Sequence, residues 1–123
     1  MTKRILKNYL NEVEILIKKI DLDNVLLLKK KILLTKKKNS KVFIFGNGGS
    51  SSTANHFAVD MTKNAKVETI SFSNDNLITC FSNDYGFEYW IENALKYYVK
   101  KNDFVIFLSV SGKSTNIINA AKY

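Results

Sequence analysis

The sequence contains no proline, a single cysteine and no apolar run long enough to cross a membrane. Cys80 cannot form a disulfide within the chain, so nothing requires an oxidising compartment. The longest purely aliphatic run is Val25–Leu28, far short of the roughly 20 residues of a transmembrane helix. Glu12 and Glu14 interrupt the N-terminal segment before it could form the apolar core of a signal peptide. We therefore expect a cytoplasmic protein with no membrane association.

The net charge of +8 is confined to the first third of the chain. Residues 1–41 hold 12 of the 19 basic and 4 of the 11 acidic side chains, whereas residues 42–123 hold seven of each. A basic patch can attract nucleic acid, but these lysines alternate with apolar positions at helical spacing. We therefore interpret the excess charge as solvated helix surface, and a nucleic-acid partner is disfavoured.

The composition, 46% hydrophobic and 24% charged, is that of a single globular domain over residues 1–123. Residues 1–40 predict two helices. Apolar residues from Ile5 to Ile20 recur at i, i+3, i+4 and i+7, and Asp21–Asn24 supplies a break and a cap before a second helix. The lysines at 36–38 suit the negative end of that second helix.

Residues 41–123 predict the first part of a parallel α/β sheet. Three continuous apolar runs, at about 41–45, 67–72 and 104–109, alternate with helical patterns near 52–63, 77–81 and 87–99. Strands of parallel sheets are buried on both faces, so they are apolar throughout. Three strands leave exposed edges, and the final helical pattern stops at Tyr123 after about two turns without a capping signal. We expect that a C-terminal portion is missing.

Glycine and serine follow two of these strands, at Gly46–Ser52 and Ser109–Ser114. Ligands of open parallel sheets bind beyond the carboxyl ends of the strands, where helix N-termini favour anions. Glycine permits close backbone approach and serine donates hydrogen bonds, so phosphate is the expected ligand. Such loops also occur in ordinary βα turns. The first loop reads GNGGSSS, which is neither GxxxxGK[ST] nor GxGxxG, so nucleotide binding is disfavoured and a mononucleotide is the alternative that stays open.

Of three further features, one has both a functional and a structural interpretation. His56 and Asp60 are four residues apart on one helix face, where they could bind a divalent metal, share proton transfer or form an ordinary surface pair. Residues 83–86, Asn-Asp-Tyr-Gly, have the composition of a turn. Cys80 lies on an apolar helical stretch, which predicts a small buried side chain.

These residues resemble, segment by segment and in order, the sedoheptulose 7-phosphate isomerases (phosphoheptose isomerases) of the SIS superfamily. The similar segments are FGNGGSSSTANHFAVDMTK, FSNDYGFEYWIENAL and VIFLSVSGKSTNIINAA, and the leading ILKNYLNEV resembles that family's first helix. The resemblance implies a SIS fold, with a three-layer α/β/α arrangement after two N-terminal helices. It implies a homotetramer whose sites combine residues of neighbouring subunits.

The implied reaction is an aldose–ketose isomerisation that serves bacterial heptose synthesis for lipopolysaccharide or capsule. Serines of both loops would hold the phosphate, and Asn47 and Asp84 would contact the sugar. His56 would be a zinc ligand in members that bind zinc, and Asp60 the general base and a further ligand. The resemblance thus assigns substrate-binding positions to Asn47, Gly48, Gly49, Ser50, Asp84, Ser109, Val110, Ser111 and Ser114.

The sequence departs from the family pattern at three places. The usual glutamate base is Asp60, which is shorter by one methylene, and Val110 replaces a threonine between two serines. The family's second catalytic histidine and a glutamine belong to a C-terminal helix that these 123 residues do not contain. We therefore expect an incomplete catalyst. The alternative function is that of a non-catalytic SIS protein that binds sugar phosphates or the replication initiator DnaA.

Overall fold

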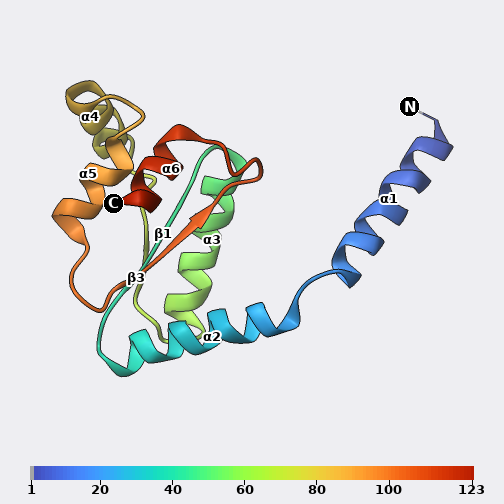
Figure 1. Cartoon of the computed structure of the whole chain (residues 1–123), viewed down its shortest axis with the longest axis horizontal. Coiled ribbons are helices and arrows are strands. Elements are labelled where there is room, and N and C mark those ends of the chain that lie inside the picture. Colours follow the sequence, from blue (N-terminus) through green and yellow to red (C-terminus); the bar gives the residue numbers. More distant parts are fainter. Residues whose placement is uncertain (1) are drawn as a thin grey trace. The chain divides into compact units, whose positions relative to one another are not determined.

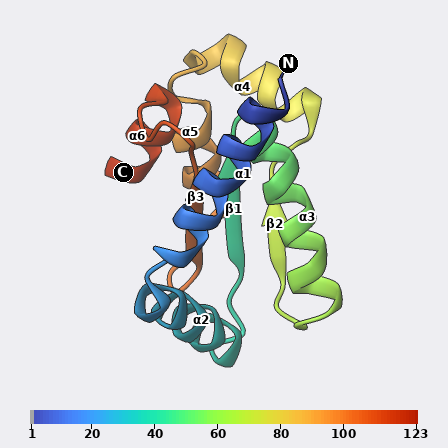
Figure 2. The ribbon, with the colours of Figure 1, turned by 90° about the vertical axis from the view of Figure 1, so that its right-hand side faces the viewer.

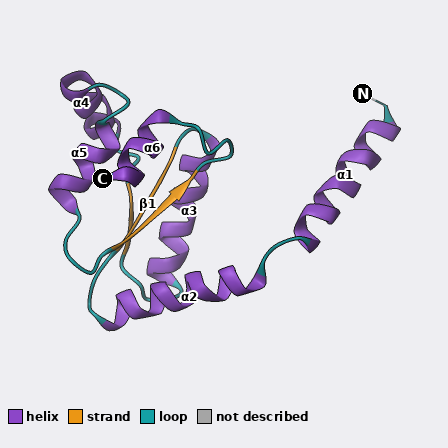
Figure 3. Ribbon diagram, in the orientation of Figure 1, coloured by secondary structure: helices purple, strands orange, loops and turns teal. Residues whose placement is uncertain are grey.

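The computed structural model describes residues 2–123, in which helices alternate with short strands from residue 42 onward (Figures 1 and 3). The elements are α1 (Lys3–Lys18), α2 (Leu22–Lys37), β1 (Val42–Gly46), α3 (Gly49–Lys63), β2 (Thr69–Ser71), α4 (Asp75–Tyr85), α5 (Trp90–Tyr98), β3 (Phe104–Leu108) and α6 (Thr115–Lys122). No described helix combines the length and the apolar character that a bilayer crossing requires.

The sheet has three parallel strands in the order β2-β1-β3. Val42 of the central strand pairs with Thr69 on one side and with Phe104 on the other. Because β1 has a neighbour on both sides and helices over both faces, its residues 42–45 are at most 1% exposed. The predicted α/β class and parallel sheet are therefore confirmed.

Alternate residues of β1 build two apolar layers, one on each face of the sheet. Phe43 and Phe45 pack with α5 and α6, and the Phe45 ring lies 5.0 Å from the Phe72 ring in a stacked arrangement. Val42 and Ile44 pack against α2 and α3 through Ile32, Ala54 and Ala58. Figure 2 shows α3 and the pair α5 and α6 on opposite sides of the strands. Burial of each large apolar side chain contributes about 1.5–3 kcal/mol.

The chain forms two compact units, residues 1–30 and 31–123. In the first unit α1 carries an apolar face as predicted, and none of its residues is buried. The Asp21 carboxylate accepts a hydrogen bond from the Asn24 N–H at 3.2 Å, so Asp21 caps α2 as predicted, whereas residues 22–24 of the predicted break form the first turn of the helix. The second unit contains the sheet and its helices.

The structure corrects the expectations for the segment between β2 and β3. Residues 83–85 form the last turn of α4 rather than a separate turn, and Gly86, at φ 86°, ends the helix. The helix also starts earlier than its apolar residues indicate, because the Asn74 side chain accepts a hydrogen bond from Leu77 N–H at 3.1 Å. Cys80 is exposed and not buried, because α4 turns Leu77, Ile78 and Phe81 toward the core instead.

Candidate functional site

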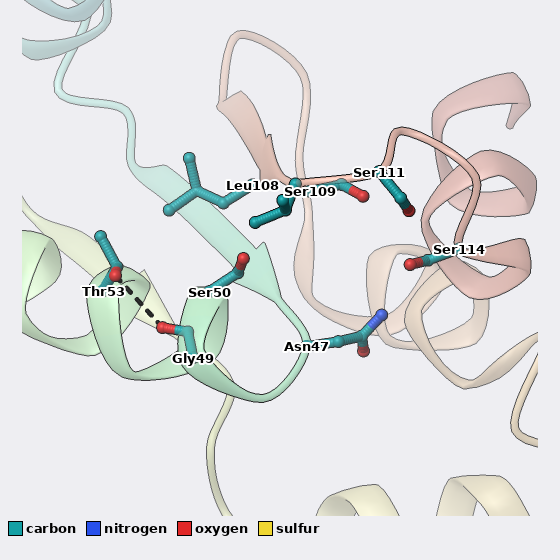
Figure 4. Close-up of a pocket in the computed structure, with 9 residues that line it drawn as sticks. Asn47, Gly49, Ser50, Thr53, Leu108, Ser109, Ser111 and Ser114 are labelled. Carbon is teal, nitrogen blue, oxygen red and sulfur yellow. Dashed lines mark hydrogen bonds between the residues drawn. The ribbon is translucent and has the colours of Figure 1, made fainter. Parts of the chain in front are cut away.

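A cavity of about 390 Å³ opens where β1 and β3 end (Figure 4). Gly46 and Leu108 are register partners in the parallel sheet, so the loops that follow them leave the same edge at the same level. We call this cavity the serine pocket; it is lined by Asn47, Gly49, Ser50, Thr53, Leu108, Ser109, Val110, Ser111 and Ser114. The predicted convergence of Ser50 and Ser111 is therefore present.

The first loop turns directly from strand to helix because of its glycines. A Cβ atom on Gly46 would lie 2.6 Å from the carbonyl carbon and oxygen of Ser50, so a side chain at position 46 collides with the first turn of α3. Gly48 adopts φ 51° and precedes the helix as a cap without a side-chain acceptor. The N-terminus of α3 therefore faces the pocket with its positive dipole end.

The second loop orients its hydroxyl groups through its own backbone. The Ser109 Oγ accepts a hydrogen bond from Gly112 N–H, and the Ser111 Oγ accepts one from Lys113 N–H, both at 3.1 Å. A hydroxyl that accepts from the backbone keeps its proton for another acceptor. Ser114 precedes α6 and makes no side-chain capping bond. Figure 4 shows Ser111 and Ser114 on the side of the opening next to Asn47, and Ser50 facing Ser109.

The two loops are tied together by a pair of asparagines. Asn47 Nδ2 donates to Asn116 Oδ1, and Asn116 Nδ2 donates to Asn47 Oδ1, each at 2.9 Å. Asn116 lies in the first turn of α6 and is only 2% exposed. Its Oδ1 also accepts from Ile117 N–H at 2.9 Å. The pair fixes the spacing between the loop after β1 and the start of α6.

No charged side chain lines the serine pocket among the described residues. Recognition there depends on hydroxyl groups, an amide and the first turn of α3. Phosphate oxygens are strong acceptors, and such neutral donors bind them at helix N-termini. The chemistry of the pocket therefore fits a compact anion that accepts several hydrogen bonds.

His56 and Asp60 line a neighbouring cavity of about 510 Å³, together with Ser52, Thr53 and Phe57. Their Nε2 and Oδ2 atoms are 3.4 Å apart, and the side chains are 82% and 53% exposed. Thr53 lines both this cavity and the serine pocket. Successive turns of α3 thus carry the predicted pair away from the loop, along the helix.

The fit of a zinc ion to this pair depends on the number of ligands. Zinc takes at least three protein ligands. His56 and Asp60 supply two, and residues 2–123 contain no group of three or more His, Cys, Asp or Glu side chains arranged to hold a metal. The described residues alone therefore do not complete a zinc site, and we derive no step through a metal.

The remaining predicted residues divide into those inside and those outside the pocket. Gly48 adjoins the lining but is not part of it. Asp84 lies on α4, where it accepts a hydrogen bond from Asn83 at 2.9 Å and the Cys80 thiol lies 3.7 Å away. It does not line the serine pocket in this structure. Thr53, Leu108 and Asn116 were not predicted from the sequence, because their only local signal is their proximity to the two loops.

Comparison with known proteins gives a consistent family. The SIS domain model matches residues 8–123. The chain is 41% identical over 87 residues to a phosphoheptose isomerase of Fusobacterium nucleatum, covering 67% of this chain and 45% of the relative. The phosphoheptose isomerase of Aliarcobacter butzleri is 38% identical over 88 residues, which cover 67% and 47% of the two chains. The chain thus spans about half the length of the curated relatives it matches.

Two solved structures share the fold. Phosphoheptose isomerase GmhA from Neisseria gonorrhoeae superimposes with a TM-score of 0.86 at 26% identity, covering 98% of this chain and 67% of that one. A phosphoheptose isomerase from Francisella tularensis gives a TM-score of 0.85 at 23% identity, covering 99% and 69%. The second likeness concerns the fold alone.

Proposed function

The chain belongs to the SIS-domain family, and from this premise we propose that its serine pocket binds the phosphate of a seven-carbon sugar phosphate. The proposed reaction is the isomerisation of sedoheptulose 7-phosphate to D-glycero-D-manno-heptose 7-phosphate, within bacterial heptose synthesis. The observation that carries the proposal is the convergence of serine hydroxyls at the N-terminus of α3. The phosphoheptose isomerases that are about 40% identical to this chain support the choice of sugar.

In the proposed complex the serines bind the phosphate and α3 extends toward the other end of the sugar. A helix rises 1.5 Å per residue, so His56 lies roughly 9 Å and Asp60 roughly 15 Å along the axis from Ser50. The carbonyl of the substrate is also at the end of its carbon chain remote from the phosphate. This direction of α3 supports a role for the His56–Asp60 pair in the proposed proton transfers.

The proposed chemistry needs a base but no external oxidant or reductant, because one carbon is oxidised as its neighbour is reduced. A carboxylate such as Asp60 removes the proton from the carbon beside the carbonyl, the electron pair forms an enediol, and the proton returns to the neighbouring carbon. The carbonyl oxygen gains a proton and the adjacent hydroxyl loses one. Ser111 and the other pocket serines hold the phosphate throughout and thereby position the reacting carbons.

We further propose a homotetramer in the cytoplasm, with sites completed by neighbouring subunits. The apolar side chains exposed on α1, among them Leu6, Leu10 and Leu16, support burial against other copies. The lone Cys80 needs no oxidising environment. Zinc would require at least one ligand in addition to His56 and Asp60.

The experiment measures binding of sedoheptulose 7-phosphate to this chain by calorimetry. Turnover is measured by detection of the product, with and without added zinc, in a version that spans the full length of the phosphoheptose isomerase relatives. Ser111→Ala should weaken binding about 10- to 150-fold, the value of one hydrogen bond to a charged group. Ser73→Ala, an exposed serine outside the pocket, should have no effect. Loss of binding restricted to Ser111→Ala supports the phosphate site, whereas equal affinity for both variants contradicts it.

A non-catalytic sugar-phosphate-binding protein is the second candidate. It is favoured by the high exposure of His56 and by the position of the His56–Asp60 pair outside the serine pocket. The same experiment separates the two functions. Binding of the heptose phosphate without product, in a version of the protein that spans the full length of its phosphoheptose isomerase relatives, would support this candidate and reject the isomerase.

A further inference from the structure

A third cavity, of about 520 Å³, lies at the opposite end of the strands from the serine pocket. Ser40 and Lys41, which line it, precede β1, and Lys100–Asp103 precede β3. The serine pocket is built instead from residues that follow these strands. Because β1 and β3 are parallel, the two cavities lie at opposite ends of these strands. A ligand in one cavity therefore does not occupy the other.

The charged side chains that line this third cavity are mostly lysines. Lys41, Lys100 and Lys101 line it, against the single carboxylate of Asp103. Asp103 accepts hydrogen bonds from the backbone N–H groups of Lys41 and Lys100, both at 2.8 Å. One carboxylate thus anchors the loops before β1 and β3 beside each other, and two amide dipoles partly offset its charge.

Two of the three lysines are available to a ligand. The Lys41 ammonium pairs with Glu68 at 2.6 Å. Lys100 and Lys101 are exposed, and neither forms an ion pair with any residue in the range 2–123. An anion that binds them breaks no existing ion pair. Charge-assisted hydrogen bonds from such ammonium groups are among the stronger polar contacts.

The same cavity has an aromatic and apolar wall. Phe43 and Ile70 contribute from the sheet, and Tyr97 and Tyr98 from the last turn of α5. The Tyr98 ring packs edge-on against Phe72 at 5.0 Å, and the Tyr97 hydroxyl lies 3.2 Å from that of Tyr85. These contacts fix the positions of the Tyr97 and Tyr98 rings, whose surfaces a flat ligand could contact.

We propose that this lysine–tyrosine cavity is a second binding site, for a small ligand that combines a phosphate group with a flat ring, as a nucleoside phosphate does. The volume falls in the range of about 300–1,000 Å³ that small-molecule sites occupy. The cavity adjoins the C-terminus of α5, whose dipole does not attract anions, so the attraction comes from Lys100 and Lys101. The tyrosine rings stack on the base.

Calorimetric titration with AMP tests the charge in this proposal. Lys100→Glu/Lys101→Glu should raise the Kd for AMP at least about tenfold, because it replaces two attractions by two repulsions. Lys29→Glu/Lys30→Glu is the matched control; it changes the net charge equally on an exposed part of α2 and should change the Kd less than about twofold. Equal effects of the two variants, or no AMP binding by the unaltered chain, would overturn the proposal.

A comparison of AMP with inorganic pyrophosphate tests the proposed contact between the tyrosine ring and the base. Tyr97→Leu, at a side chain that is 67% exposed, should weaken AMP binding and leave inorganic pyrophosphate binding unchanged. Equal loss for both probes, or loss for neither, would overturn the nucleoside part of the proposal. Ser111→Ala should leave AMP binding intact, since Ser111 belongs to the other pocket. Circular dichroism of each variant verifies that the fold is retained.

Discussion

Asn47 and Asn116 exchange two side-chain hydrogen bonds, each 2.9 Å long, and so join the loop after β1 to the first turn of α6. They are 69 positions apart in the chain, and each amide satisfies the other where Asn116 is buried. We expect Asn116→Ala to lower the free energy of unfolding by about 1–3 kcal/mol, because Asn47 loses its partner. Urea unfolding measures this loss.

The matched test of this pair is a double-mutant cycle. If the two amides act as a unit, Asn47→Ala/Asn116→Ala should cost less than the sum of the single changes. Strict additivity of the single changes would show that the two asparagines do not interact energetically.

Alanine substitutions at Gly46 and Gly49 should have opposite effects on the stability of the protein. Gly46→Ala should destabilise the protein by about 1–3 kcal/mol, because its Cβ would approach the Ser50 backbone to 2.6 Å. Gly49→Ala meets no atom within 4 Å in the first turn of α3, so it should be neutral or stabilising by up to about 1 kcal/mol. Thermal unfolding of both variants measures the contrast. Similar destabilisation by both would contradict the steric explanation.

Under the proposed reaction, the length of the side chain at position 60 controls turnover, which is measured in a version that spans the full length of the phosphoheptose isomerase relatives. Asp60→Glu lengthens the carboxylate by one methylene toward the family pattern and should increase kcat up to about a hundredfold, the effect of about 1 Å in the placement of a base. Asp60→Asn removes the base and should abolish turnover while sugar-phosphate binding remains. Unchanged kcat in Asp60→Asn would exclude Asp60 as the base.

The contact between Tyr85 and Tyr97 should make the stability of the fold depend on pH. The hydrogen bond with Tyr97, followed by charge repulsion between the two tyrosines, raises the pKa of Tyr85 above its ordinary value of 10.0. Because the folded-state pKa is the higher one, the contact stabilises the fold fully below about pH 10 and is lost as the pH rises through the folded pKa. Tyr97→Phe should lower the Tyr85 pKa, measured from tyrosinate absorbance. An unchanged titration curve would disprove the coupling.

The order of the helices and strands could be predicted because the signals are local. Continuous apolar runs marked β1 and β3, and glycine and serine marked the loops that follow them. The parallel topology then placed Ser50 and Ser111 at one sheet edge. This part of the site therefore depends on strand direction alone.

Contacts between residues far apart in the sequence, and the exposure of single side chains, could not be predicted. Nothing near Asn116 indicates a partner 69 positions away, and periodicity could not show which face of α4 exposes Cys80. Helical spacing put His56 and Asp60 on one face, but it did not reveal that they line a separate cavity. Periodicity gives the direction in which a side chain points around the helix axis. Whether that side chain reaches a ligand also depends on its position along the axis.

The register of β1 and β3 has a consequence for insertions and deletions. Gly46 faces Leu108, so removal of one residue from β3 would shift the serine loop by about 3.3 Å and turn every following strand side chain to the other face. Phe107 would then leave the aromatic layer at the same moment as the hydroxyl groups lost their alignment. The five residues of β3 therefore determine both the position of the ligand-binding loop and the packing of the core. A deletion in this strand would disrupt both at once.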